Sequence, residues 1–115
     1  MISRQHRFHG LNSLKVVYKY GQTARHQQLN LRYQLNDKRQ SYRCAVVVSK
    51  KVNKSAVGRN RIRRRIFETI RLLEPKITKP YDLVITVYSA GISDLPSDQL
   101  SQQIERLLAS AGVIW

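Results

Sequence analysis

The feature that most constrains the fold is a regular spacing of isoleucines within a strongly basic stretch, residues 49–73. Ile62, Ile66 and Ile70 recur every four residues, and Leu73 follows three residues later. This spacing predicts an α-helix with one apolar side. Nine of the 25 residues are Lys or Arg and only one is acidic, so the other side of the helix is cationic. Such a helix must bury its apolar side against a scaffold, which leaves its cations facing solvent.

Three segments predict that this scaffold is a β-sheet. Residues 29–35 alternate apolar and polar side chains, the pattern of a half-buried strand. Residues 41–49 are apolar on both faces at their middle, which is typical of a central strand. We expect these two strands to form an antiparallel pair around a polar turn at residues 36–39. Residues 81–88 are rich in β-branched side chains and predict another strand.

The remaining signals predict helices and their ends. Residues 10–20 favour a short helix, and Gly21 suits the left-handed position that often ends one. Ser55 is the expected N-cap of the basic helix. Residues 97–110 carry an apolar stripe and predict a closing helix, and a short extra strand is expected near residues 23–27. The economical arrangement is one mixed sheet with helices packed on it.

Size and charge narrow the class of protein. The 115 residues suffice for one domain, residues 1–115, in which residues 1–9 form a basic N-terminal segment. The formal net charge is +14, and 18 of the 21 Lys and Arg residues lie in residues 1–73. This asymmetry indicates a polyanionic partner, most simply a nucleic acid.

A membrane role and an extracellular location are disfavoured. No apolar run approaches the roughly 20 residues that span a bilayer, and the N-terminus lacks the apolar segment of a secretory signal. Cys44 is the only cysteine and lies in an apolar run, so we expect a small core residue and no intramolecular disulfide. The expected location is a reducing cytoplasm.

No catalytic or metal-binding constellation emerges from the sequence. His6 and His9 could be proposed as a ligand pair, but no third ligand is near, and solvated polar residues are the better interpretation. Neither a nucleophile elbow nor a phosphate-binding glycine loop is present.

The start of the basic helix is suited to binding phosphate. Arg59, Asn60 and Arg61 fall in its first turns, where backbone N–H groups and the helix dipole already favour anions. Guanidinium groups bind phosphate oxygens in pairs. The lysines just upstream extend the same patch; they are Lys50, Lys51 and Lys54.

Residues 49–64 closely resemble the signature of the bacterial ribonuclease P protein component. The shared features are Ser-Lys-Lys at 49–51, Ser-Ala-Val at 55–57 and Gly-Arg-Asn-Arg at 58–61, followed by a basic pair at 63–64. The resemblance extends over most of the chain. It implies a small α+β fold, a two-layer sandwich of order αβββαβα with a mixed sheet and a left-handed βαβ crossover, as in a ribosomal-protein domain.

The resemblance also implies a function. The holoenzyme would be ribonuclease P, an endoribonuclease that removes the 5′ leader from precursor tRNA. Its RNA would perform the hydrolysis with Mg²⁺ held largely by that RNA, and one protein per RNA would assist. The implied contacts to the catalytic RNA are Lys50, Lys51, Lys54, Arg59, Asn60, Arg61, Arg63, Arg64 and Arg65.

A second implied surface is a cleft for the single-stranded leader, between the first helix and the sheet. Tyr18 and Tyr88 would offer stacking surfaces, although packing in the core explains Tyr18 equally well. Leu14 and Arg32 stand where the family often has aromatic residues. The residues expected to line this cleft are Phe8, Leu14, Tyr18, Asn30, Arg32, Arg43 and Tyr88.

Two alternatives stay open at this stage. One is a general or ribosomal RNA-binding protein without an enzymatic role, which composition alone does not separate from a ribonuclease P subunit. The other is an autonomous basic nuclease, which the lack of paired acids or histidines disfavours.

Overall fold

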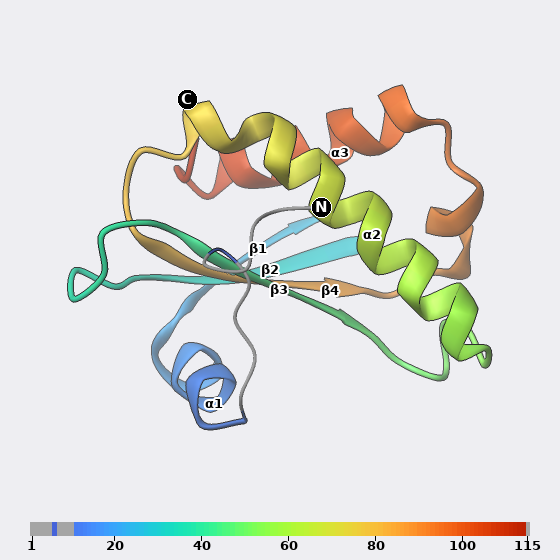
Figure 1. Ribbon diagram of the computed structural model, residues 1–115, viewed down its shortest axis with the longest axis horizontal. Coiled ribbons are helices and arrows are strands. Elements are labelled where there is room, and N and C mark those ends of the chain that lie inside the picture. The colour runs from blue at the N-terminus through green and yellow to red at the C-terminus, as the bar shows by residue number, and fades with distance from the viewer. Residues whose placement is uncertain (1–5, 7–10, 115) are drawn as a thin grey trace.

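The computed structural model describes residue 6 and residues 11–114. Its centre is a four-stranded mixed sheet in the order β1-β2-β4-β3, in which β1, β2 and β4 are antiparallel and β3 runs parallel to β4. Helices α2 and α3 cover one face of this sheet and α1 lies on the other (Figure 1). The elements are α1 (Leu11–Tyr20), β1 (Gln22–His26), β2 (Leu29–Leu35), β3 (Arg43–Val48), α2 (Ala56–Leu73), η2 (Glu74–Lys76), β4 (Tyr81–Val87), η3 (Ala90–Asp94) and α3 (Ser97–Ser110).

The isoleucine spacing does bury one side of α2. Ile62, Ile66 and Ile70 are fully buried against the sheet and α3, and Leu73 packs at the edge of the same core. Each such side chain contributes about 1.5–3 kcal/mol when removed from water. The closing helix adds its own buried stripe, which includes Leu100, Ile104, Leu107 and Leu108. The predicted amphipathic helices and the order αβββαβα are confirmed.

A smaller apolar cluster holds α1 on the opposite face of the sheet. Val17 is buried against Ala45 of β3 and Val84 of β4, with Leu14 and Val47 packed around them. Neither α2 nor α3 covers this face, which also carries polar side chains, among them Asn30 and Arg32 of β2 and Thr86 of β4.

The expectation that residues 41–49 form a central strand is wrong. β3 lies at the edge of the sheet, and β4 separates it from β2, so the expected antiparallel pair of β2 and β3 does not form. β3 is apolar on both faces because helices cover both faces: Val46 joins the core under α2, whereas Ala45 packs with α1. A strand that is apolar on both faces is buried on both faces, but this pattern does not tell whether the strand is central or at the edge of the sheet.

The expectation for Gly21 is also wrong, because its backbone is not in the left-handed region. The position needs glycine for space. A Cβ atom there would lie 2.4 Å from the carbonyl oxygen of Val17 and 2.9 Å from that of Tyr33. The end of α1 can thus approach β2 closely only if residue 21 has no side chain.

Other local predictions hold. Ser55 is the N-cap of α2, and its Oγ accepts a hydrogen bond from the N–H of Gly58 at 3.2 Å. Cys44 is fully buried, and burial raises the pKa of its thiol to about 12. Within the described residues, no helix combines the length and apolar character needed to cross a bilayer.

Candidate nucleic-acid interface

The loop between β3 and α2 presents lysines at one end of the sheet. We call residues 49–55 the lysine loop. Backbone hydrogen bonds from the N–H groups of Val52 and Asn53 to the carbonyl oxygen of Ser49 close its first turn. The three side chains on its outside are exposed; they are Lys50, Lys51 and Lys54.

The first turns of α2 continue this cationic surface. Arg61 and Arg64 are exposed, and neither side chain bonds to another residue in the described part of the chain. Arg63 is half-buried and donates from Nη1 to the Oδ1 of Asn60 at 2.7 Å. Exposed guanidinium groups beside a helix N-terminus and a lysine loop form a surface that suits a phosphate backbone.

Two of the arginines predicted to bind RNA donate hydrogen bonds to the protein backbone. Arg59 donates to the carbonyl oxygens of Asn53 at 3.0 Å and Lys54 at 3.1 Å. Arg65 donates to the carbonyl oxygens of Ile92, Ser93 and Leu95 at the end of η3. The guanidinium group of Arg59 thus provides donors for backbone carbonyls at the end of the lysine loop, and that of Arg65 does so at the end of η3.

The cationic surface weakens toward the C-terminal end of α2. There Arg71 donates from Nε to the Oε1 of Glu68 at 3.0 Å. The hydrogen bond with Arg71 lowers the pKa of the Glu68 carboxyl to about 2, so this acid is charged at neutral pH. The excess positive charge therefore lies at the N-terminal end of α2, beside the lysine loop.

The expected leader residues lie on the sheet face that carries α1, but several serve the fold. Arg32 donates to the Oγ1 of Thr23 at 2.7 Å and to the carbonyl oxygens of Val17 and Tyr18, which fixes the last turn of α1. Asn30 is only 7% exposed, and its buried Oδ1 has no hydrogen-bond partner among the described residues.

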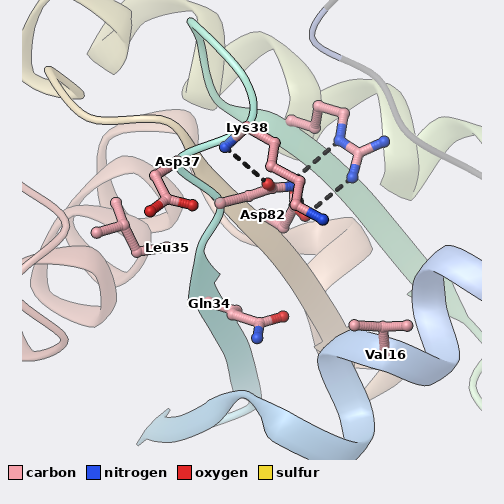
Figure 2. Close-up of a pocket in the computed structure, with 8 residues that line it drawn as sticks. Val16, Gln34, Leu35, Asp37, Lys38 and Asp82 are labelled. Carbon is pink, nitrogen blue, oxygen red and sulfur yellow. Dashed lines mark hydrogen bonds and ion pairs between the residues drawn. The ribbon is translucent and has the colours of Figure 1, made fainter.

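Arg43 belongs to a buried ion pair at the far end of this face. Its Nε and Nη2 donate to the carboxylate of Asp82 at 2.8 and 2.9 Å, and the Nδ2 of Asn36 donates to the same carboxylate at 3.0 Å. The pair forms the wall of a pocket of about 370 Å³ (Figure 2). Asp37 and Lys38 also line this pocket, so its charges balance and it is a poor site for a polyanion.

Two aromatic residues of the expected leader cleft, Tyr18 and Tyr88, are accessible. Tyr18 is 44% exposed and Tyr88 is 55% exposed, so neither belongs to the core. The guanidinium carbon of Arg25 lies 5.6 Å from the centre of the Tyr88 ring, a cation–π contact. Leu14, on α1, is half-buried against the sheet, and Phe8 lies outside the described residues.

A hollow of about 680 Å³ joins the two sets of residues. Lys50 and Lys51 of the lysine loop line it, together with Thr86 of β4 and Tyr88 just after that strand. Sequence reasoning missed Arg25 and Thr86. Alternation along the strands could have indicated them, because it places Arg25, Asn30 and Thr86 on one face of the sheet once the strand register is known.

The described residues hold no group of three or more His, Cys, Asp or Glu side chains that could bind a metal ion. His6 stacks on Tyr42 with ring centres 4.3 Å apart, and its Nδ1 lies 3.0 Å from the Tyr42 carbonyl oxygen. His9, its suggested partner as a ligand, lies outside the described residues. The cations and exposed aromatic rings of this surface are suited to binding phosphates and unpaired bases.

The model of one protein family, described as Ribonuclease P, matches residues 2–112. The Ribonuclease P protein component of Chloroflexus aurantiacus is 45% identical over 77 residues, which cover 67% of this chain and 56% of that protein. That of Synechocystis sp. is 35% identical over 101 residues, which cover 87% of this chain and 80% of that protein. The matched stretch thus spans little more than half the length of the Chloroflexus relative.

Solved structures share the fold. A mutant RNase P protein of Staphylococcus aureus superposes with a TM-score of 0.86 at 25% identity, covering 96% of this chain and 92% of that chain. The RNase P protein of Thermotoga maritima superposes with a TM-score of 0.81 at 19% identity, covering 90% of this chain and 96% of that chain, and supports the fold alone.

Proposed function

The chain belongs to the ribonuclease P protein family, and from this premise we propose that it acts as the protein subunit of a ribonuclease P. The observation that carries the proposal is the exposed cationic surface formed by the lysine loop, Arg61 and Arg64. The subunit binds a catalytic RNA there and assists removal of the 5′ leader from precursor tRNA. The RNA performs the phosphodiester hydrolysis and holds the Mg²⁺ that the reaction requires.

Electrostatics support the anchor to the catalytic RNA. Each Lys or Arg that neutralises a phosphate releases condensed counterions, and log K then falls with log salt by about 0.9 per contact on a duplex. Arg61 and Arg64 offer such contacts without first breaking an interaction within the described residues. The N-terminal end of the α2 dipole also favours phosphate there.

The leader, in this proposal, crosses the sheet face beside α1 and reaches the hollow next to the lysine loop. Tyr18 and Tyr88 provide exposed rings on which unpaired bases stack, an interaction that contributes about 1–3 kcal/mol per base. Arg32 and Arg43 stabilise the elements that carry this surface. Arg32 bonds to α1, and Arg43 bonds to Asp82 of β4. Phe8 and Asn30 stay predicted contacts.

The proposal is tested by cleavage of precursor tRNA at near-physiological salt over a range of Mg²⁺ concentrations. The chain alone should cleave nothing, and together with the ribonuclease P RNA of the same organism it should lower the Mg²⁺ needed for half-maximal cleavage. Replacing both Arg61 and Arg64 with Ala should remove most of this effect. Lys76→Ala is the matched control, because Lys76 is an exposed cation paired with Glu105 away from this surface.

Two outcomes would contradict the proposal. If the RNA works equally well without the chain at every Mg²⁺ concentration, the chain is not its subunit, and a general RNA-binding protein becomes the better account. If the chain free of nucleic acid cleaves RNA, it is an autonomous nuclease.

A further inference from the structure

The backbone of the lysine loop is bonded by two side chains, that of Arg59 on α2 and that of Asn53 in the loop itself. Nη1 of Arg59 donates to the carbonyl oxygens of two loop residues, Asn53 at 3.0 Å and Lys54 at 3.1 Å. The Oδ1 of Asn53 accepts from the N–H of Ser55 at 2.9 Å. A hydrogen bond to a charged donor contributes about 1.5–3 kcal/mol, so Arg59 is a strong tie between α2 and the loop.

Gly58 leaves the space in which the Asn53 side chain lies. A Cβ atom at residue 58 would be 2.4 Å from the Nδ2 of Asn53 and 2.7 Å from its Oδ1. Gly58 is inside α2 and has no positive φ, so its role is to leave space rather than to allow an unusual backbone. A glycine there costs about 1 kcal/mol of helix stability relative to alanine. Glycine, a weak helix former, thus stands at position 58, where any side chain would collide with Asn53.

From these contacts we propose that Asn53, Gly58 and Arg59 form a lock that positions the lysine loop for RNA. Arg59 is then a positioning residue that acts through Lys50, Lys51 and Lys54, rather than a phosphate ligand equivalent to Arg61. The inference rests on the proposed function, since it explains how the RNA-binding cations are held. A loop ordered before binding avoids the entropic cost of ordering each residue on the RNA, about 1–2 kcal/mol per residue.

The lock also shapes the hollow. Asn53 and Lys54, whose carbonyl oxygens Arg59 holds, directly follow the segment from Ser49 to Val52, which lines the 680 Å³ hollow together with Tyr88. Moving this segment would change the distance between the lysines and the ring without altering any charge.

Gly58→Ala tests the lock without changing charge. The added methyl group displaces the Asn53 side chain and removes its bond to Ser55, while alanine favours the helix. We expect faster hydrogen exchange at the N–H of Ser55, unchanged or higher thermal stability, and about fivefold weaker binding to the ribonuclease P RNA, the effect of one ordinary hydrogen bond. Val57→Ala is the matched control: Val57 precedes Gly58 in α2 and is 74% exposed, and its truncation should leave RNA binding unchanged.

The role of Arg59 is tested by measuring the same affinity at low salt in two backgrounds. In the native background Arg59→Ala should weaken binding severalfold. In a chain whose three loop lysines are replaced with Gln, Arg59→Ala should have almost no further effect, because it acts through those lysines. Arg61→Ala should weaken binding in both backgrounds, because Arg61 is a separate contact.

The outcomes separate the inference from the function on which it rests. An equal loss for Arg59→Ala in both backgrounds, or unchanged RNA binding in Gly58→Ala, would overturn the lock and leave the subunit role intact. Failure of the unaltered chain to bind the ribonuclease P RNA would instead overturn the subunit role.

Discussion

At the scale of single residues, Arg61 and Arg65 lie one helical turn apart on α2 but have different surroundings. The Arg61 side chain is exposed and bonds to no other described residue. The Arg65 side chain donates to three backbone carbonyls within residues 92–95. The family resemblance implies both as RNA contacts, Arg61 as part of the Arg-Asn-Arg motif and Arg65 as an additional cation beside it. Only the fold brings the end of η3, almost 30 residues away in the chain, against one of them.

This difference predicts opposite effects of two alanine substitutions. Arg65→Ala should lower the free energy of unfolding by about 2 kcal/mol, because it removes charged hydrogen bonds to Ile92, Ser93 and Leu95. Arg61→Ala should change stability by less than about 0.5 kcal/mol but lower the slope of log K against log salt by about 0.7–0.9. Urea unfolding and fluorescence anisotropy with labelled RNA measure the two quantities. Equal salt slopes for the native chain and Arg61→Ala would argue against a phosphate contact.

At the scale of elements, the sequence predicts the helices better than the sheet. The bounds of α3 match the predicted residues 97–110, and Ser55 caps α2 as expected, because caps and apolar stripes are local signals. The order of the strands is not local. Alternation along β2 tells which residues share a face, but nothing in it tells that β4 will lie between β2 and β3.

In the candidate site, too, local features could be predicted from the sequence and tertiary contacts could not. The exposure of Arg61 and of the lysines follows from the helical wheel and the loop, so it could be predicted. The engagement of Arg32 and Arg43 could not, because their partners on α1 and β4 are set by tertiary packing. The cation–π contact between Arg25 and Tyr88 likewise depends on the sheet register.

The ion pair of Arg43 and Asp82 ties β3 to β4 and, through Asn36, to the turn after β2. Asp82 is only 4% exposed, so removal of its charge should cost about 3–5 kcal/mol, the usual effect of breaking a buried pair. We expect Asp82→Asn to lower the melting temperature by on the order of 10 °C or more. Calorimetry measures this shift.

Glu105→Gln is the matched control for that prediction. It removes the acid of the exposed pair with Lys76, whose side chains are 49% and 46% exposed, and should cost at most about 1 kcal/mol. Similar melting temperatures for the two variants would show that the Arg43–Asp82 pair does not hold the strands together.

At the scale of the whole molecule, one small sheet carries two surfaces that meet at one end. The cations of the lysine loop and α2 form the first, and the exposed rings on the α1 face form the second. The hollow between Lys51 and Tyr88 lies where they join. In the proposed subunit, this arrangement brings the catalytic RNA and the leader of its substrate to adjacent parts of a 115-residue chain.

Sequencing the RNA that copurifies with the chain from its own cells tests this account most directly. Ribonuclease P RNA should be the most enriched species relative to total RNA, and the enrichment should fall when Arg61 and Arg64 are both replaced with Ala but persist in Lys76→Ala. Recovery of ribosomal RNA without ribonuclease P RNA would contradict the account.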